Sequence, residues 1–441
     1  MELQEKTVAL FRLMNLVFVE FTRKEKLHFT TLFARVAYVC HQQKLDGRLE
    51  YYIHSFRKYA RQPESAKIKL SAKEWYEFGR TVLCKTLAAL LDTPVPDELA
   101  KKNSDWPPMG RPVDVVAYKP KIRIIALEID RECDQIVART EEDSEALIRV
   151  QFNLPERNEN FNPTIKAIEA VLSFPVVLNL IEVEIDSEGV YRPRAFVVEP
   201  DYLMDVSAVA ECFKDFGTEP LLYLLKKFLP FTPTKHLLLG NVANFFLDEL
   251  MNDETHSFRD LFPKVFQLNP LSLCLFEDRE IREVMQKSQL HFLNLKRMVL
   301  QEFEQLGIDR ANSFLEPTFY SETYGLQGRL DVFYKAENGK QKSAIVELKS
   351  GKAYKPNAYG ISSNHFVQTL LYDLIVRSVY GKAIDPANYI LYSGLEERQL
   401  RFAPLIKSQQ FEAIQLRNQL VMLEYLLGQL GQDENASLLE Q

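Results

Sequence analysis

The chain lacks a membrane-spanning apolar run and an N-terminal secretion signal. Its longest apolar candidate, residues 170–181, is interrupted by Ser173, Pro175 and Asn179, whereas a transmembrane helix needs about 20 mostly apolar residues. Charged residues precede the first apolar stretch, which is not the pattern of a secretory signal. We therefore expect a cytoplasmic protein.

Cysteine is also scarce. Among 441 residues there are five cysteines, and no two of them form a C-x-x-C pair. This scattered spacing argues against a disulfide framework, a zinc ribbon and an iron–sulfur cluster with closely spaced ligands. The sequence predicts buried free thiols instead. The five are Cys40, Cys84, Cys133, Cys212 and Cys274.

Two further absences limit the function. The net charge of −7 does not indicate a nucleic-acid binder, although a local basic patch can bind nucleic acid on an acidic protein. There is no G-x-x-x-x-G-K-[ST] phosphate loop, so the chain is not itself a P-loop motor. Its length is sufficient for two or three domains, each with its own core.

A change from helical to β-type residue patterns divides the first half of the chain into two regions. Residues 1–105 look helical, with a capping-box signature at Ser71 and Glu74. The Pro-rich stretch that follows Trp106 predicts a boundary. Residues 106–200 contain short β-type runs and predict a small antiparallel barrel, of the oligonucleotide-binding type or a structural β-module without a ligand. The expected strands are 123–129, 146–152, 176–185 and 195–198.

The second half, residues 201–430, is mostly helical up to about Gly307. A strand pair follows, and then a helix, a strand and a long final helix. The expected bounds of these three elements are 365–380, 389–392 and 410–427. Residues 431–441 are polar and predict a tail or a junction.

The most informative stretch lies between Gly325 and Lys349. Two apolar runs flank a polar turn at Asn338 and Gly339, which predicts a β-hairpin. Glu347 and Lys349 share one face of the second strand. Because this strand is otherwise apolar, the two charges are costly unless they are paired or bind a metal.

Asp331 lies on the first run and could bring a second carboxylate to Glu347. Mg²⁺ and Mn²⁺ prefer oxygen ligands and keep several waters, so these carboxylates and the backbone carbonyl of Leu348 would suffice as protein ligands. Lys349 would orient an attacking water and neutralise charge on a phosphate. The pattern predicts a metal-dependent phosphodiester hydrolase. On a solvated strand, the same Glu-x-Lys pattern would carry little meaning.

The helix after this strand carries a second polar group. His365, Gln368 and Tyr372 are spaced i, i+3 and i+7, and therefore share one helical face. An imidazole, an amide and a phenol suit contacts with DNA phosphates and sugars, although capped or solvent-facing residues give the same pattern. Lys352 and Lys355 add positive charge beyond the strand, suited to a groove that follows a DNA backbone.

Three motifs, G-L-Q-G-R-L-D, V-E-L-K-S-G-K and H-x-x-Q-x-x-x-Y, occur in this order. Together they resemble the RecB-type branch of the PD-(D/E)XK nucleases, and most of all the nuclease domain of eukaryotic-type replication helicase-nucleases. The resemblance covers mainly residues 200–430. It implies an α/β fold with a restriction-endonuclease-like core, in which a mixed central sheet is flanked by helices. A small β-barrel and an N-terminal helical domain would precede this core.

The resemblance also implies roles for individual residues. Asp331 and Glu347 would be metal ligands, and Lys349 would be the catalytic lysine. Gln368 and Tyr372 would contact DNA near the scissile phosphate, with His365 beside them.

Two departures from the family pattern stand out. Members usually place a metal-ligating histidine on an earlier helix, after a glycine, where this chain has Asn244 after Gly240. Asn244 offers only a neutral oxygen, and Asp248, one turn further on, could compensate. Many relatives also bind an iron–sulfur cluster through four cysteines, whereas here only Cys212 lies near an expected position. We therefore expect Mg²⁺ or Mn²⁺ and no iron–sulfur cluster.

The sequence thus predicts a DNA nuclease that acts on single strands, ends or flaps, with a helicase fused C-terminally in a longer protein or acting in trans. The main alternative is a weak or inactive single-strand-binding subunit of a repair or defence complex, for which Asn244 is the best support. A third possibility is an interaction scaffold built on residues 1–200. Polarity, DNA-versus-RNA preference and pathway stay open.

Overall fold

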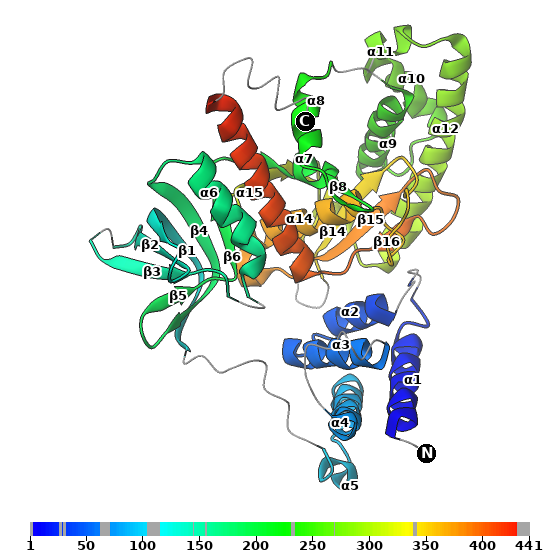
Figure 1. Ribbon diagram of the computed structural model, residues 1–441. Coiled ribbons are helices and arrows are strands. Elements are labelled where there is room, and N and C mark those ends of the chain that lie inside the picture. The colour runs from blue at the N-terminus through cyan, green and yellow to red at the C-terminus, as the bar shows by residue number, and fades with distance from the viewer. Residues whose placement is uncertain are drawn as a thin grey trace. The chain divides into compact units, whose positions relative to one another are not determined.

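The structure is a computed structural model of the chain (Figure 1). The residues that it describes are 3–25, 29, 32–61, 71–103, 115–143, 145–154, 157–230, 234–268, 270–337 and 342–429. The chain divides into two compact units, Met1–Pro112 with Ala358–Gly360, and Val113–Asn357 with Ile361–Gln441. The predicted boundary after Trp106 and the predicted tail at 431–441 lie outside the described residues.

The first unit is helical, as the sequence predicts. Its helices are α1 (Leu3–Phe21), α2 (Leu32–Gln42), α3 (Gly47–Arg61), α4 (Ala72–Leu91) and α5 (Asp97–Ala100). The capping box at the start of α4 is confirmed, because the Ser71 side chain accepts from the Glu74 amide and the Glu74 carboxylate accepts from the Ser71 amide. Trp75, Phe78 and Val82 of this helix are buried, so the periodicity in the sequence marks its core face.

The predicted small barrel is present in the second unit. Strand order is β1-β2-β3-β5-β4, and an additional β1–β4 pairing closes the ring. The sixth strand, β6, pairs with β4. Sequence reasoning missed β2 and β5 and made β1 too short. The strands are β1 (Val115–Asp130), β2 (Gln135–Thr140), β3 (Leu147–Gln151), β4 (Val176–Asp186), β5 (Val190–Arg192) and β6 (Ala195–Val198).

A five-stranded mixed sheet forms the centre of the same unit, in the order β10-β13-β14-β15-β16. β14 pairs antiparallel with β13 and parallel with β15. Helices α14 and α9 both pack against β14, and Figure 1 shows α14 and α15 on the barrel side of the sheet, with α9 and α12 on the other. A mixed sheet flanked by helices is therefore confirmed. The strands are β10 (Ser313–Leu315), β13 (Val332–Tyr334), β14 (Ala344–Lys349), β15 (Ala387–Tyr392) and β16 (Leu400–Phe402).

The remaining elements connect these layers. The helices are α6 (Asn162–Val171), α7 (Val206–Glu211), α8 (Leu221–Phe228), α9 (Lys235–Asn252), α10 (Phe258–Leu268), α11 (Pro270–Cys274), α12 (Asp278–Arg297), α13 (Phe303–Gln305), α14 (Ser363–Tyr380) and α15 (Lys407–Gln429). The short strands are β7 (Met204–Asp205), β8 (Phe213–Lys214), β9 (Gly217–Thr218), β11 (Thr318–Ser321) and β12 (Leu326–Arg329). Among the described helices, none combines the length and the apolar character needed to cross a bilayer.

The predicted hairpin is confirmed only in part. β13 and β14 pair antiparallel, but the run that begins at Gly325 is not one strand. It splits into β12, which pairs with β11 and with the distant β7, and β13, which belongs to the central sheet. The break falls at Leu330 and Asp331, where the Leu330 amide donates to the Pro317 carbonyl. The turn at Asn338 lies outside the described residues.

A buried arginine joins the barrel to the central sheet. Arg417 of α15 is fully buried and donates to the carbonyls of Val198, Glu199 and Tyr202, which follow the barrel, and to that of Gly325. Gly325 has a φ of +60°, and a Cβ there would overlap the Arg417 guanidinium. The start of β12 therefore needs glycine for both conformation and space.

Candidate active site

The two charged residues of β14 lie together, as period-2 alternation predicts. Lys349 Nζ is 2.8 Å from Glu347 Oε1. The Glu347 side chain is 4% exposed, whereas that of Lys349 is 21% exposed. The carboxylate is thus enclosed within the sheet, while the ammonium keeps a path to solvent. A buried carboxylate with a cationic neighbour is strongly held in place.

Asp331 reaches the same place from the break before β13. Its Oδ2 accepts from the Leu348 amide at 2.6 Å, one residue after Glu347. Val332 pairs with Val346 in the β13–β14 ladder, which places Asp331, just before β13, next to Glu347. The structure therefore brings together the three predicted catalytic residues, Asp331, Glu347 and Lys349.

The pKa values of these groups follow from burial and mutual charge. Burial raises the pKa of Asp331 well above its usual range, and the Glu347 charge raises it further. Burial also raises the pKa of Glu347, although Lys349 opposes the shift. Burial lowers the pKa of Lys349, but the two carboxylates outweigh it and the net shift is upward. Two buried carboxylates that both resist ionisation mark a place where added positive charge is favourable.

One oxygen at this site has no hydrogen-bond partner. Glu347 Oε1 accepts from Lys349 and Gln368, but the buried Oε2 has none. An unsatisfied buried carboxylate oxygen is costly, and a divalent cation would satisfy it. Among the described residues, no group of three or more His, Cys, Asp or Glu side chains is arranged to hold a metal. Asp331 and Glu347 with a backbone carbonyl and waters would still suit Mg²⁺ or Mn²⁺.

The polar face of α14 points at this site. Gln368 Nε2 donates to Glu347 Oε1 at 2.8 Å, and the Tyr372 hydroxyl donates to the Arg329 carbonyl at 2.8 Å. Gln368 is 8% exposed and Tyr372 is 1% exposed. Gly328 makes room for the Tyr372 ring, since a Cβ there would lie 2.7 Å from it. Both side chains thus position protein groups, and their contact with DNA stays a prediction.

His365, at the start of the same face, is held by a tyrosine. Its Nδ1 lies 3.0 Å from the hydroxyl of Tyr392, at the end of β15. Burial, followed by the Lys349 charge, lowers the pKa of His365 to about 3. The imidazole is therefore neutral near pH 7 and shares one hydrogen bond with the tyrosine hydroxyl. Contact of His365 with DNA stays a prediction.

Helix α9 carries Asn244, the residue predicted to stand in for the histidine usual in the resembling nucleases. A Cβ on Gly240 would lie 3.7 Å from Ser350 Oγ, just beyond β14, and Asn244 follows one turn later on the same face. One further turn on, burial and the nearby Glu316 raise the pKa of Asp248 to about 6, against Arg329. Asn244 as a metal ligand stays a prediction.

The two predicted basic residues lie beyond the strand. Lys352 is exposed. Lys355 is also largely exposed and forms an ion pair with Asp215 at 2.8 Å, which reduces the net positive charge that it offers to DNA. Whether they bind DNA stays a prediction.

Sequence reasoning missed several residues that support the site. Ser207 Oγ accepts from Gln368 at 3.3 Å. Ser393, after β15, donates from its amide to the Lys349 carbonyl at 3.0 Å, and its hydroxyl lies 3.0 Å from His291 Nδ1 on α12. Asn294 donates to the Ser393 carbonyl at 2.8 Å. Only the i, i+3 spacing of His291 and Asn294 was visible in the sequence.

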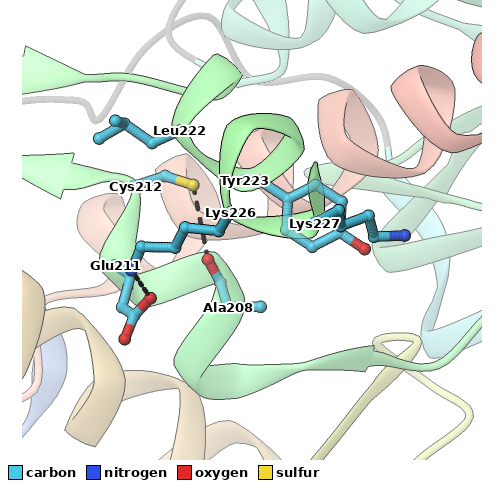
Figure 2. A pocket seen from close by; sticks show the side chains of 7 residues that line it. All are labelled: Ala208, Glu211, Cys212, Leu222, Tyr223, Lys226 and Lys227. Atoms are coloured by element: carbon cyan, nitrogen blue, oxygen red, sulfur yellow. Dashed lines mark hydrogen bonds and ion pairs between the residues drawn. The ribbon is translucent and has the colours of Figure 1, made fainter. Parts of the chain in front are cut away.

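A separate cavity of about 190 Å³ lies between α7 and α8 and contains none of the predicted site residues. Figure 2 shows the Cys212 thiol in its wall, donating to the Ala208 carbonyl at 3.4 Å, and Lys226 paired with Glu211. Burial raises the pKa of Cys212, so it is held as a thiol. The prediction of a cluster-free protein stays open. The other lining residues are Leu222, Tyr223 and Lys227.

No family model matches the chain. Over 241 residues the chain is 25% identical to the DNA replication ATP-dependent helicase/nuclease dna2 of Schizosaccharomyces pombe. The match covers 51% of this chain and 16% of that protein, so the chain spans about a sixth of the relative's length. A crystal structure of a proposed exonuclease from Eubacterium rectale gives a TM-score of 0.36 at 14% identity, over 52% of this chain and 84% of that one. A likeness this low carries no argument.

Proposed function

We propose that this protein is a divalent-metal-dependent nuclease of the PD-(D/E)XK type that hydrolyses DNA phosphodiester bonds on single strands, ends or flaps. One observation carries the proposal above all. Inside an apolar strand, the Glu347 carboxylate faces Lys349 and Gln368 while one of its oxygens is left without a partner. A purely structural ion pair would be expected to satisfy both oxygens. The 25% identity to a helicase/nuclease agrees with this chemistry.

Asp331 and Glu347, with the Leu348 carbonyl, would hold the cation. When bound, Mg²⁺ or Mn²⁺ makes a water nucleophilic at neutral pH and offsets charge on the phosphate. Three contacts within the chain position the side chains that would surround the cation. Glu347 fixes Lys349 Nζ at the site, the Leu348 amide orients Asp331, and Gln368 clamps Glu347 from α14.

Lys349 acts as a cation in this account. Its two carboxylate neighbours raise its pKa, so the ammonium keeps its protons near pH 7. It can donate hydrogen bonds to an attacking water and to a phosphate oxygen, where negative charge develops during phosphodiester cleavage. It does not serve as the general base.

We further propose that a helicase works with this nuclease, in the same longer chain or in trans. This rests on the name of the relative, a helicase/nuclease, of which the chain matches only a part. A second candidate function is that of a single-strand-binding subunit with a weak nuclease centre. Asn244, in the position of the family histidine, favours it.

The test is a cleavage assay with end-labelled single-stranded, duplex and flap DNA in Mg²⁺, in Mn²⁺ and in EDTA. We expect wild-type protein to cut single strands in Mn²⁺, and Glu347→Gln to abolish cutting. Glu322→Gln is the matched control, because this glutamate is exposed. If wild type and Glu347→Gln bind DNA equally and neither cuts it, the protein is the binding subunit.

A further inference from the structure

The loop between β14 and α14 displays an aromatic ring. Tyr354 is 73% exposed, more than any other tyrosine among the described residues. Lys355 Nζ lies 5.5 Å from the centre of its ring. Single exposed aromatic residues are common, so the exposure alone has no functional meaning. The contacts that fix the backbone of Tyr354 give its exposure a functional meaning.

The backbone of Tyr354 is fixed on both sides by one buried side chain. Its amide donates to Ser362 Oγ at 2.8 Å, and Ser362 Oγ donates to its carbonyl at 3.2 Å. The next residue, Lys355, has a φ of +40°, a left-handed conformation that a residue with a Cβ adopts only when its surroundings enforce it. The side chain of Lys355 forms an ion pair with Asp215. The ring is therefore exposed on a constrained backbone.

The same contacts tie this ring to the candidate active site. The Ser362 amide donates to the Tyr392 hydroxyl at 3.3 Å, which also binds His365. Ser362 immediately precedes α14, and six residues later Gln368 binds Glu347. At a helical rise of 1.5 Å per residue, six residues correspond to roughly 9 Å. The backbone of Tyr354 is thus anchored fewer than two turns of α14 away from the residue that binds Glu347.

We propose that Tyr354 is a base-stacking residue that receives an unpaired nucleobase beside the bond to be cut. This inference rests on the proposed function and specifies its substrate. Every base offers a π-face to an aromatic ring, so stacking binds single strands without regard to sequence. Bases inside a duplex already stack on one another and present no free face. A pre-positioned ring also loses little entropy on binding. Tyr354 therefore selects unpaired strands over duplex.

The experiment compares Tyr354→Ala and Tyr354→Phe in the full chain. Fluorescence anisotropy gives the Kd for a labelled single-stranded oligonucleotide and for a hairpin duplex without free bases, in EDTA so that no cleavage occurs. The alanine variant is expected to weaken single-strand binding roughly 5- to 150-fold, the range for loss of one stacked base, and to leave duplex binding unchanged. The phenylalanine variant keeps the ring and should bind within about twofold of wild type.

Tyr320→Ala is the matched control, since this tyrosine of β11 is also largely exposed, at 60%, and lies outside the barrel. The proposal is overturned if Tyr354→Ala binds single strands like wild type, if both its affinities fall equally, or if the phenylalanine variant fails like the alanine one. Cleavage of the same oligonucleotide by wild type in Mn²⁺, measured in parallel, reports on the proposed function by itself.

Discussion

Asp248→Asn tests whether α9 places a destabilising negative charge beside the candidate active site. Asp248 is partly buried and lies near Glu316. The loss of hydration and this second negative charge raise its pKa to about 6. Glu316 is in turn joined to the site, because its amide donates to the Asp331 carbonyl at 3.0 Å. The asparagine variant keeps the size of the side chain and removes the charge.

The size of the effect follows from linkage. The pKa of Asp248 rises from its usual 3.8 to about 6, which corresponds to about 3 kcal/mol at 1.36 kcal/mol for each tenfold change in acidity. The ionised carboxylate thus destabilises the folded state by at most about 3 kcal/mol, and solvent screening lowers this to an expected ~1–2 kcal/mol. Above pH 6 the full cost is present. Below pH 3.8 both folded and unfolded chains are protonated, and the cost disappears.

Urea unfolding at pH 7.5 and at pH 4, in EDTA, measures this difference. We expect Asp248→Asn to be more stable than wild type by ~1–2 kcal/mol at pH 7.5 and nearly equal to it at pH 4. Asp260→Asn is a control of opposite sign, because hydrogen bonds from Ser257 lower the pKa of Asp260 and its charge therefore stabilises the fold. An Asp248 variant that is less stable at pH 7.5, or whose gain is the same at both pH values, would refute the reasoning.

Two other substitutions test the supports of the site. Ser393→Ala removes the hydroxyl that joins His291 to the turn holding the Lys349 carbonyl, and we expect kcat to fall roughly tenfold at unchanged KM. Ser288→Ala is the control, because Ser288 lies on α12 with His291 and its Oγ has no hydrogen-bond partner. We expect this variant to change neither kcat nor KM. Equal losses of kcat in both variants would contradict the role of Ser393. Arg417→Met leaves buried carbonyls unsatisfied and should cost at least about 3 kcal/mol in urea unfolding, whereas a loss below about 1 kcal/mol would show that it does not join barrel and sheet.

The clustering of the charged residues of β14 could be predicted from the sequence for a simple reason. Charged residues stand out in an apolar strand, and the period of two places Glu347 and Lys349 on one face. Likewise, helical spacing places Gln368 and Tyr372 together. These signals depend only on near neighbours in the chain, so they survive without knowledge of the tertiary fold.

Other features depend on partners far away in the sequence. The split between β12 and β13 is set by the pairing of Leu326 with Met204, which no local pattern reveals. Ser393 reaches the Lys349 carbonyl only because β15 lies parallel to β14. The burial of Tyr372 follows from the space above Gly328. In each case local composition gave no signal, because the cause is a long-range contact.

Binding of a divalent cation to the two buried carboxylates is the claim on which the proposed function depends. Calorimetric titration of the metal-free protein with Mn²⁺ tests it most directly, with Glu347→Gln and the exposed-site variant Glu322→Gln alongside. We predict saturable binding by wild type and by Glu322→Gln, accompanied by proton release as the raised pKa values of Asp331 and Glu347 fall, and no binding by folded Glu347→Gln. Equal Mn²⁺ binding by wild type and Glu347→Gln would contradict the account.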